Sequence, residues 1–206
     1  MGLTYSYEIH LPPKNVATLL AHMAALAPPE RHKPPLDLTL PDGQRITLPF
    51  TSHFEGGTAD WSRSDESWFE LDTSLLFDAY DGEEADDDLR AYAEEHVHEP
   101  RADGRFQVGY IYASIGFGSP PSGYAVVACW AATSRMSRLF ERSAGVRTTF
   151  TDLTAAAGGV CCLFDFGDGS PEEVLWLNGE SMRERIPGTR FPDEQSLVAT
   201  WPDLPA

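Results

Sequence analysis

Two apolar segments separated by a short linker constrain the fold of this chain most strongly. Residues 105–117 (RFQVGYIYASIGF) and 123–132 (GYAVVACWAA) have the β-branched, aromatic and alternating character of strands. The linker between them, GSPPSG, consists of turn-forming residues, so the two strands are predicted to run antiparallel as a hairpin. We expect this hairpin to form the centre of a sheet.

Other segments repeat the hairpin pattern. Residues 36–50 read as two alternating arms around Asp42-Gly43, a pair that supplies the positive φ of a tight turn. Residues 159–166 and 172–179 read as two strands around a GDGSPEE turn. Single strands are predicted at 4–11 and 67–80.

Helices are predicted between these strands at 13–26, 86–100, 134–142 and 146–159. Hairpins dominate the order and βαβ crossovers are scarce, which predicts an α+β fold with a mainly antiparallel sheet and helices packed on it. We expect one domain over 1–180, with two similar lobes, 1–103 and 104–180, as an open alternative. Residues 181–206 contain four prolines and are expected to form an irregular tail packed on the surface.

The negative charge is concentrated in one quarter of the chain. The formal net charge is −17, and residues 55–103 alone hold seventeen acidic residues against three arginines. Such a surface repels the phosphates of nucleic acids and of anionic membranes, so we expect neither as a partner. It attracts a basic protein and accelerates the encounter, although acidic faces also serve solubility alone.

The acidic segment before the helix at 86–100 is the candidate contact for a basic protein partner. Carboxylates are also favourable there because the N-terminus of a helix is the positive end of its dipole. The partner-binding residues that we predict are Asp81, Glu83, Glu84, Asp86, Asp87 and Asp88.

A second candidate site lies where the strand at 123–132 leads into the helix at 134–142. Hydroxyl groups, free N–H groups and arginines at a helix start suit an anion. Two alternatives stay open: the arginines pair with the acidic segment 81–88, or they face a partner. The anion-binding residues that we predict are Thr133, Ser134, Arg135, Arg138 and Arg142.

The sequence LFDAYDG (76–82) recurs as LFDFGDG (163–169). We interpret both copies as an apolar strand that ends in an Asp-Gly turn. The alternative is a divalent metal held by Asp78, Asp81, Asp165 and Asp168, although neither copy has the spacing of an EF-hand loop.

No cofactor, metal site or catalytic residue is predicted. His96 and His98 point about 200° apart on a helix, and the three cysteines lack zinc or disulfide spacing. Phosphate-loop, kinase and nucleophile-elbow signatures are missing. Reduced thiols, no apolar run of membrane length and no signal peptide favour a cytoplasmic protein. Two lysines against thirteen arginines, with abundant Ala, Gly and Pro, indicate a GC-rich bacterial source.

Two functional hypotheses follow. The first is a soluble acidic interaction protein that captures a basic protein partner, as an inhibitor or immunity-type protein would. The alternative is a domain that binds an anion or small molecule, or an enzyme of unfamiliar type, at the helix start around Ser134, Arg135 and Arg138.

Overall fold

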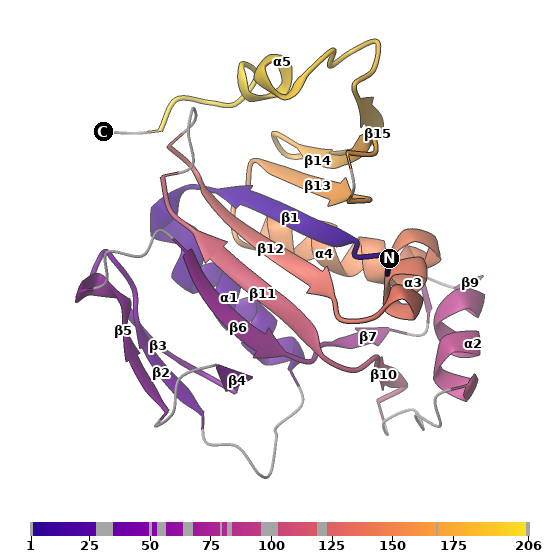
Figure 1. Ribbon diagram of the computed structural model, residues 1–206, viewed down its shortest axis with the longest axis horizontal. Coiled ribbons are helices and arrows are strands. Elements are labelled where there is room, and N and C mark those ends of the chain that lie inside the picture. The colour runs from indigo at the N-terminus through magenta and orange to yellow at the C-terminus, as the bar shows by residue number, and fades with distance from the viewer. Residues whose placement is uncertain are drawn as a thin grey trace.

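The computed structural model describes residues 2–27, 35–49, 51–52, 57–63, 68–78, 80–81, 84–95, 103–118, 123–167 and 169–204. It confirms the predicted α+β fold with mostly antiparallel sheets. The elements are arranged around one large sheet, and Figure 1 shows helices packed behind it.

Every neighbouring pair in this eight-stranded sheet is antiparallel, and the strand order is β15-β14-β13-β1-β12-β11-β6-β4. The predicted central hairpin is present as β11 and β12. β1 lies between β12 and β13, so strands from both halves of the chain share one sheet. The bounds are β1 (Ser6–Leu11), β4 (Thr51–Ser52), β6 (Trp68–Thr73), β11 (Ile111–Gly116), β12 (Ala125–Ala131), β13 (Cys161–Asp165), β14 (Glu172–Leu177) and β15 (Glu180–Ile186).

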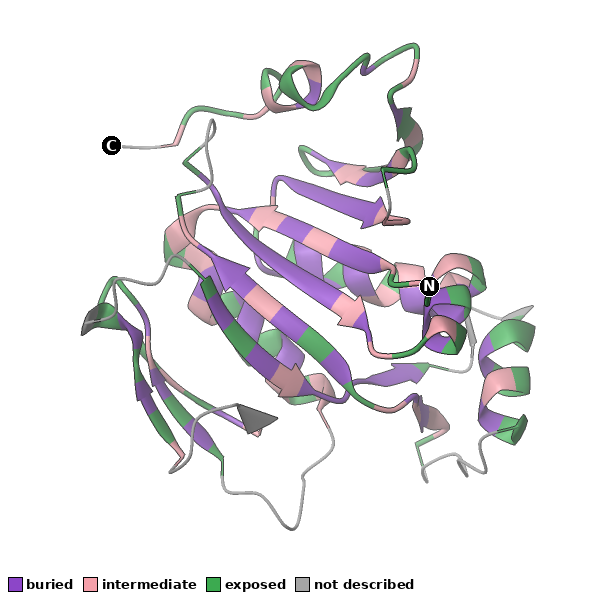
Figure 2. Cartoon of the chain, in the orientation of Figure 1, coloured by how far each residue is buried: buried purple, intermediate pink, exposed green. Residues whose placement is uncertain are grey.

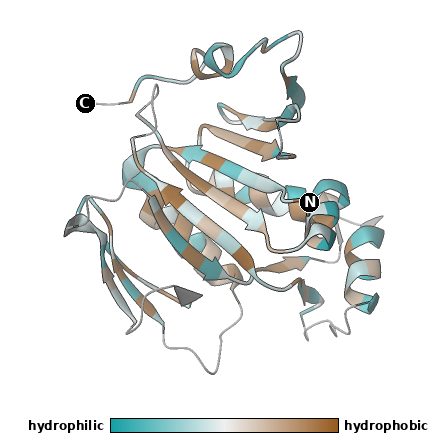
Figure 3. Cartoon of the chain, in the orientation of Figure 1, coloured by the Kyte–Doolittle hydropathy of each residue, from teal (hydrophilic) through white to brown (hydrophobic). Residues whose placement is uncertain are grey.

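Helices cover one face of this sheet: α1 (Val16–Leu26), α3 (Ser134–Arg142) and α4 (Ala144–Ala156), with the 3-10 turn η1 (Pro13–Asn15) leading into α1. Tyr7 of β1 lies at the centre of the core that they enclose. Its ring stacks on Phe150 at a centroid distance of 4.3 Å, and its hydroxyl donates to the Phe140 carbonyl at 2.7 Å. Figure 3 shows that hydrophobic residues concentrate on the inner strands and hydrophilic residues on α2 (Asp87–Glu95) and β15.

Smaller sheets flank the large one. The predicted hairpin at 36–50 is confirmed as β2 (Leu36–Thr39) and β3 (Arg45–Leu48), and β2 also pairs in parallel with β5 (Thr58–Asp60) before the 3-10 turn η2 (Trp61–Arg63). β7 (Leu76–Asp78) pairs with β10 (Arg105–Gln107), and β8 (Tyr80–Asp81) pairs with β9 (Glu84–Ala85).

Two predicted strands are interrupted. The segment 67–80 divides into β6 and β7, and the segment 105–117 divides into β10 and β11. The two breaks lie side by side because the Ser74 hydroxyl donates to the carbonyl of Gly109 at 2.7 Å, and Gly109 has a φ of 103° that favours glycine. Both strands therefore leave the large sheet together and pair again as β7 and β10.

The expectation that residues 181–206 are irregular is wrong for two stretches. β15 extends the sheet as a hairpin with β14, and α5 (Glu194–Val198) follows with Asp193 as its N-cap. Asn178 and Gly179 between β14 and β15 both have positive φ, as tight hairpin turns require. Phe191 and Leu197 of this segment are buried.

Candidate binding site

The face of the large sheet opposite the helices is the main candidate site. Side chains alternate along a strand, so Tyr7 and Ile9 of β1 face the core while Glu8 and His10 face the other way. Figure 2 shows this alternation of buried and partly exposed residues along β1 and β6. In the described part of the chain, α5 covers one end of this face, and no helix lies across it over β11 (Figure 1).

An aromatic hollow of about 520 Å³ opens on this face. Its small lining residues are Ala113 and Ser114 of β11. Trp68 lies opposite Gly116 in the strand register. Gly116 makes room for the ring of Trp68: a Cβ there would lie 2.9 Å from that ring. The hollow is lined by Thr4, Trp68, Glu70, Leu71, Tyr112, Ala113, Ser114 and Trp130.

The aromatic walls are partly exposed and fixed in place. Trp68 and Tyr112 are each 48% exposed, which is high for large apolar side chains. The Trp130 indole N–H donates to the Ser114 hydroxyl at 3.2 Å, and Tyr112 lies opposite Trp130 across the β11–β12 ladder. These rings offer flat surfaces on which a planar or cationic group can stack.

An acidic hollow of about 210 Å³ adjoins the aromatic one, and the two share Trp68 and Trp130. α5 and the segment after it form its cover, with Leu197 buried and the Trp201 ring 4.9 Å from that of His10. We call the two hollows together the groove. The acidic hollow is lined by Glu8, His10, Trp68, Val126, Ala128, Trp130, Leu163, Glu172, Glu194, Leu197, Val198 and Trp201.

Carboxylates dominate the electrostatics of the groove. Burial, with Asp165 and Glu194 nearby, raises the pKa of Glu8 to about 7. Burial and the charges of Glu8, Glu194 and Asp165 raise the pKa of Glu172 to about 7 as well. Burial lowers the pKa of His10 to about 4, so this imidazole is neutral at pH 7. None of the described residues that line either hollow is lysine or arginine.

The predicted partner-binding residues have different environments. Asp86 is only 6% exposed, so its assignment as a surface contact is wrong. Its carboxylate accepts from the Ser143 hydroxyl at 2.5 Å, from Gly145 N–H at 2.8 Å and from Leu89 N–H at 2.9 Å. It therefore joins the start of α2 to the corner between α3 and α4.

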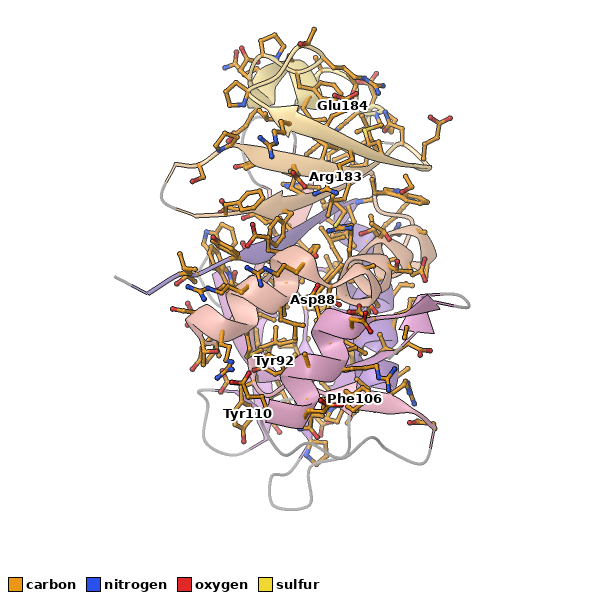
Figure 4. The ribbon with its side chains drawn as sticks, turned by 90° about the vertical axis from the view of Figure 1, so that its right-hand side faces the viewer. Asp88, Tyr92, Phe106, Tyr110, Arg183 and Glu184 are labelled. Atoms are coloured by element: carbon orange, nitrogen blue, oxygen red, sulfur yellow. The ribbon has the colours of Figure 1, made fainter. Side chains whose placement is uncertain are left out.

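The remaining acidic residues of that segment are only partly described. Asp87 and Asp88 are exposed in the first turn of α2, where Figure 4 shows Asp88, with Tyr92 further along the helix. Only the backbone of Asp81 and Glu84 is described, and Glu83 lies outside the described residues.

The hydroxyl groups of the predicted anion site are used within the chain. Thr133 caps α3 by accepting from Met136 N–H at 3.2 Å, and Ser134 accepts from Leu3 N–H at 2.8 Å. Arg135 forms an ion pair with Glu95 at the end of α2, which resembles the intramolecular alternative but involves a residue outside 81–88. Arg138 and Arg142 are exposed.

The two copies of the LFD sequence have different places in the fold. Asp78 ends β7 in a two-stranded sheet, whereas Asp165 ends β13 in the large sheet. Asp165 accepts from Gly167 N–H at 2.7 Å, as expected for a turn after a strand. The described residues contain no group of three His, Cys, Asp or Glu side chains arranged to hold a metal, and Asp168, His96 and His98 lie outside them.

The groove is not evident from the sequence alone. Glu8, Trp68 and Glu172 come from strands far apart in the chain, and no local spacing connects them. The available signal was the alternation in 4–11, which put polar residues on one face of a strand otherwise predicted to lie in the core.

Within the described residues, no helix is long and apolar enough to cross a membrane. No family model matches the chain, and no curated protein and no solved structure matches it significantly.

Proposed function

We propose that this protein captures a basic protein partner and holds a positively charged segment of it in the groove. The observation that carries the proposal is the composition of the groove: four glutamates and four aromatic residues line it, and none of the described lining residues is lysine or arginine. A role as an inhibitor or immunity-type protein fits this chemistry.

The physical basis is charge and ring complementarity. Guanidinium and ammonium groups bind over Trp and Tyr faces with about 0.5–2 kcal/mol, more where water is excluded. Trp, Tyr and Arg are the residues that dominate binding energy at protein interfaces. The net charge of −17 adds long-range attraction, to which the exposed Asp87 and Asp88 contribute.

The experiment is affinity capture from lysate with three versions of the purified protein, quantified by mass spectrometry at low and high salt. We expect one basic protein to be enriched by the wild type, and Tyr112→Ala to reduce its recovery about tenfold. Tyr110→Ala is the matched control: Tyr110 is also 48% exposed, lies two positions away and lines neither hollow.

Salt gives a second criterion. Recovery of the partner should fall at high ionic strength because the exposed part of the attraction is screened within about 10 Å at 0.1 M salt. Equal recovery of the same proteins by the wild type and by Tyr112→Ala would contradict the proposal. So would capture of acidic proteins only.

A further inference from the structure

The acidic hollow is small and closed enough to select one side chain. Its walls come from β1, β12, β13 and β14, and α5 with Trp201 covers it. At about 210 Å³ it has the volume of about seven water molecules in the liquid, which matches the end of one long side chain. Trp68 and Trp130 connect it to the aromatic hollow, through which a partner segment would pass.

Three polar atoms of residues that line this hollow are buried and lack a hydrogen-bond partner. They are His10 Nε2, Glu172 Oε2 and Trp201 Nε1. A buried polar atom without a partner costs about 1–3 kcal/mol, and native proteins retain few of them. Three in one small cavity indicate that a polar ligand completes their hydrogen bonds.

The chemistry of these atoms limits what the ligand can be. The carboxylate of Glu172 can accept hydrogen bonds from a ligand. Glu8, whose Oε2 lies 3.8 Å from His10 Nε2, adds a second carboxylate. Two glutamates facing one cavity favour a ligand with several N–H donors and a positive charge. Trp201 Nε1 is a donor only, so the ligand also needs an acceptor nearby.

We propose that the acidic hollow is the subsite for a single arginine side chain of the basic partner, with the guanidinium paired to Glu8 and Glu172. This inference rests on the proposed function. Arginine fits better than lysine because its planar fork binds carboxylates in pairs and stacks on aromatic rings such as Trp68 and Trp130. The carbonyl of the residue that carries it supplies the acceptor for Trp201.

Binding of an arginine side chain at this subsite should release protons. The raised pKa values of Glu8 and Glu172, about 7 each, leave part of their protons bound at pH 7 in the free protein, and His10, also in the hollow, is neutral. Asp165 and Glu194 face the same cluster as further negative charges. A guanidinium favours the ionised carboxylates, so its binding releases protons at pH 7 and strengthens as the pH rises from 6 to 8.

The test uses N-acetyl-arginine amide as the probe and N-acetyl-citrulline amide as its neutral isostere. Binding is followed by NMR titration of the tryptophan indole N–H signals, and proton release by calorimetry in two buffers of different ionisation enthalpy. We expect saturable arginine binding at least tenfold stronger than citrulline binding, with protons released at pH 7.

Matched variants locate the binding. Glu172→Gln and Glu8→Gln should each weaken arginine binding at least tenfold. Asp152→Asn removes an exposed carboxylate from α4, on the helical side of the sheet, and should leave binding unchanged. Equal binding of both probes, no saturable binding, or binding insensitive to both glutamate variants would overturn the subsite.

The subsite and the proposed function can fail separately. A basic protein that is captured by the wild type and by Glu172→Gln but lost by Tyr112→Ala would refute the subsite and leave the proposed function standing. Arginine binding that meets every criterion above, without any basic protein captured, would support the subsite and contradict the proposed function.

Discussion

Replacing Glu8 by glutamine should stabilise the protein at alkaline pH. The pKa of Glu8 rises from 4.5 to about 7 on folding, chiefly through burial. The folded state therefore holds this proton more tightly, and its contribution to stability is complete below pH 4.5 and lost as the pH rises through 7. Glutamine has the same shape and cannot ionise, so Glu8→Gln removes that loss.

The magnitude follows from the shift. At about 1.4 kcal/mol per pKa unit, a shift from 4.5 to about 7 corresponds to about 3 kcal/mol at pH 8.5. The side chain is 25% exposed, so most of it is shielded from solvent. At pH 5.5 the folded protein keeps Glu8 protonated while the unfolded chain has largely lost the proton, and about 1 kcal/mol of the gain remains.

Urea unfolding at pH 8.5 and pH 5.5 measures this difference. We expect Glu8→Gln to increase the free energy of unfolding more at pH 8.5 than at pH 5.5, by about 2 kcal/mol. Asp152→Asn, at an exposed position on α4, should change it by less than about 0.5 kcal/mol at either pH. A gain of the same size at both pH values, or a loss at pH 8.5, would refute the reasoning.

Three further outcomes are expected. Gly116→Ala places a Cβ 2.9 Å from the Trp68 ring and should displace it, seen as a changed tryptophan emission maximum and weaker partner capture; an unchanged spectrum would contradict this. Asp86→Ala removes an acceptor of three buried hydrogen bonds and should destabilise the protein by about 3 kcal/mol in urea unfolding, whereas Asp88→Ala should change stability little. Burial lowers the pKa of His10 to about 4, so its contribution to stability is present above pH 6.5 and is lost as the pH falls through 4. His10→Gln should therefore reduce the loss of stability on acidification, measured by thermal melts from pH 7 to pH 4.

The fold class was predictable because its signals are local. Turn residues such as Asp42-Gly43 fix a hairpin within a few residues, and the structure confirms that hairpin together with the pairing of β11 and β12. The helix at 134–142 was also correct, since Thr133 is an N-cap whose side chain acts within its own turn.

The interrupted strands and β15 were missed for different reasons. The breaks near Ser74 and Gly109 depend on a hydrogen bond between two segments that are distant in the chain, so the sequence of either segment alone does not reveal them. β15 carries charged residues on an edge strand, which conceals the apolar alternation. Its turn, Asn178-Gly179, was nevertheless a strong hairpin signal in the sequence.

The candidate site could not be predicted from the sequence because its residues come together only through the pairing and register of the strands. Ser114 comes to line the aromatic hollow beside Trp68 and Trp130 only once β11 lies between β6 and β12. Asp86 was also mispredicted, because a run of aspartates predicts a solvated face. Its carboxylate instead accepts hydrogen bonds from Ser143 and Gly145 at the corner between α3 and α4.

The position of β1 between β12 and β13 also constrains how the chain is made. Its two ladder partners are synthesised long after it, and even the contact that holds the start of the chain, Leu3 N–H to Ser134 Oγ, spans 131 residues. Contacts of such high sequence separation slow folding because a long loop must close before they form. During translation both edges of β1 therefore stay unpaired until β12 and β13 have left the ribosome, and an unpaired strand edge is open to association with other chains.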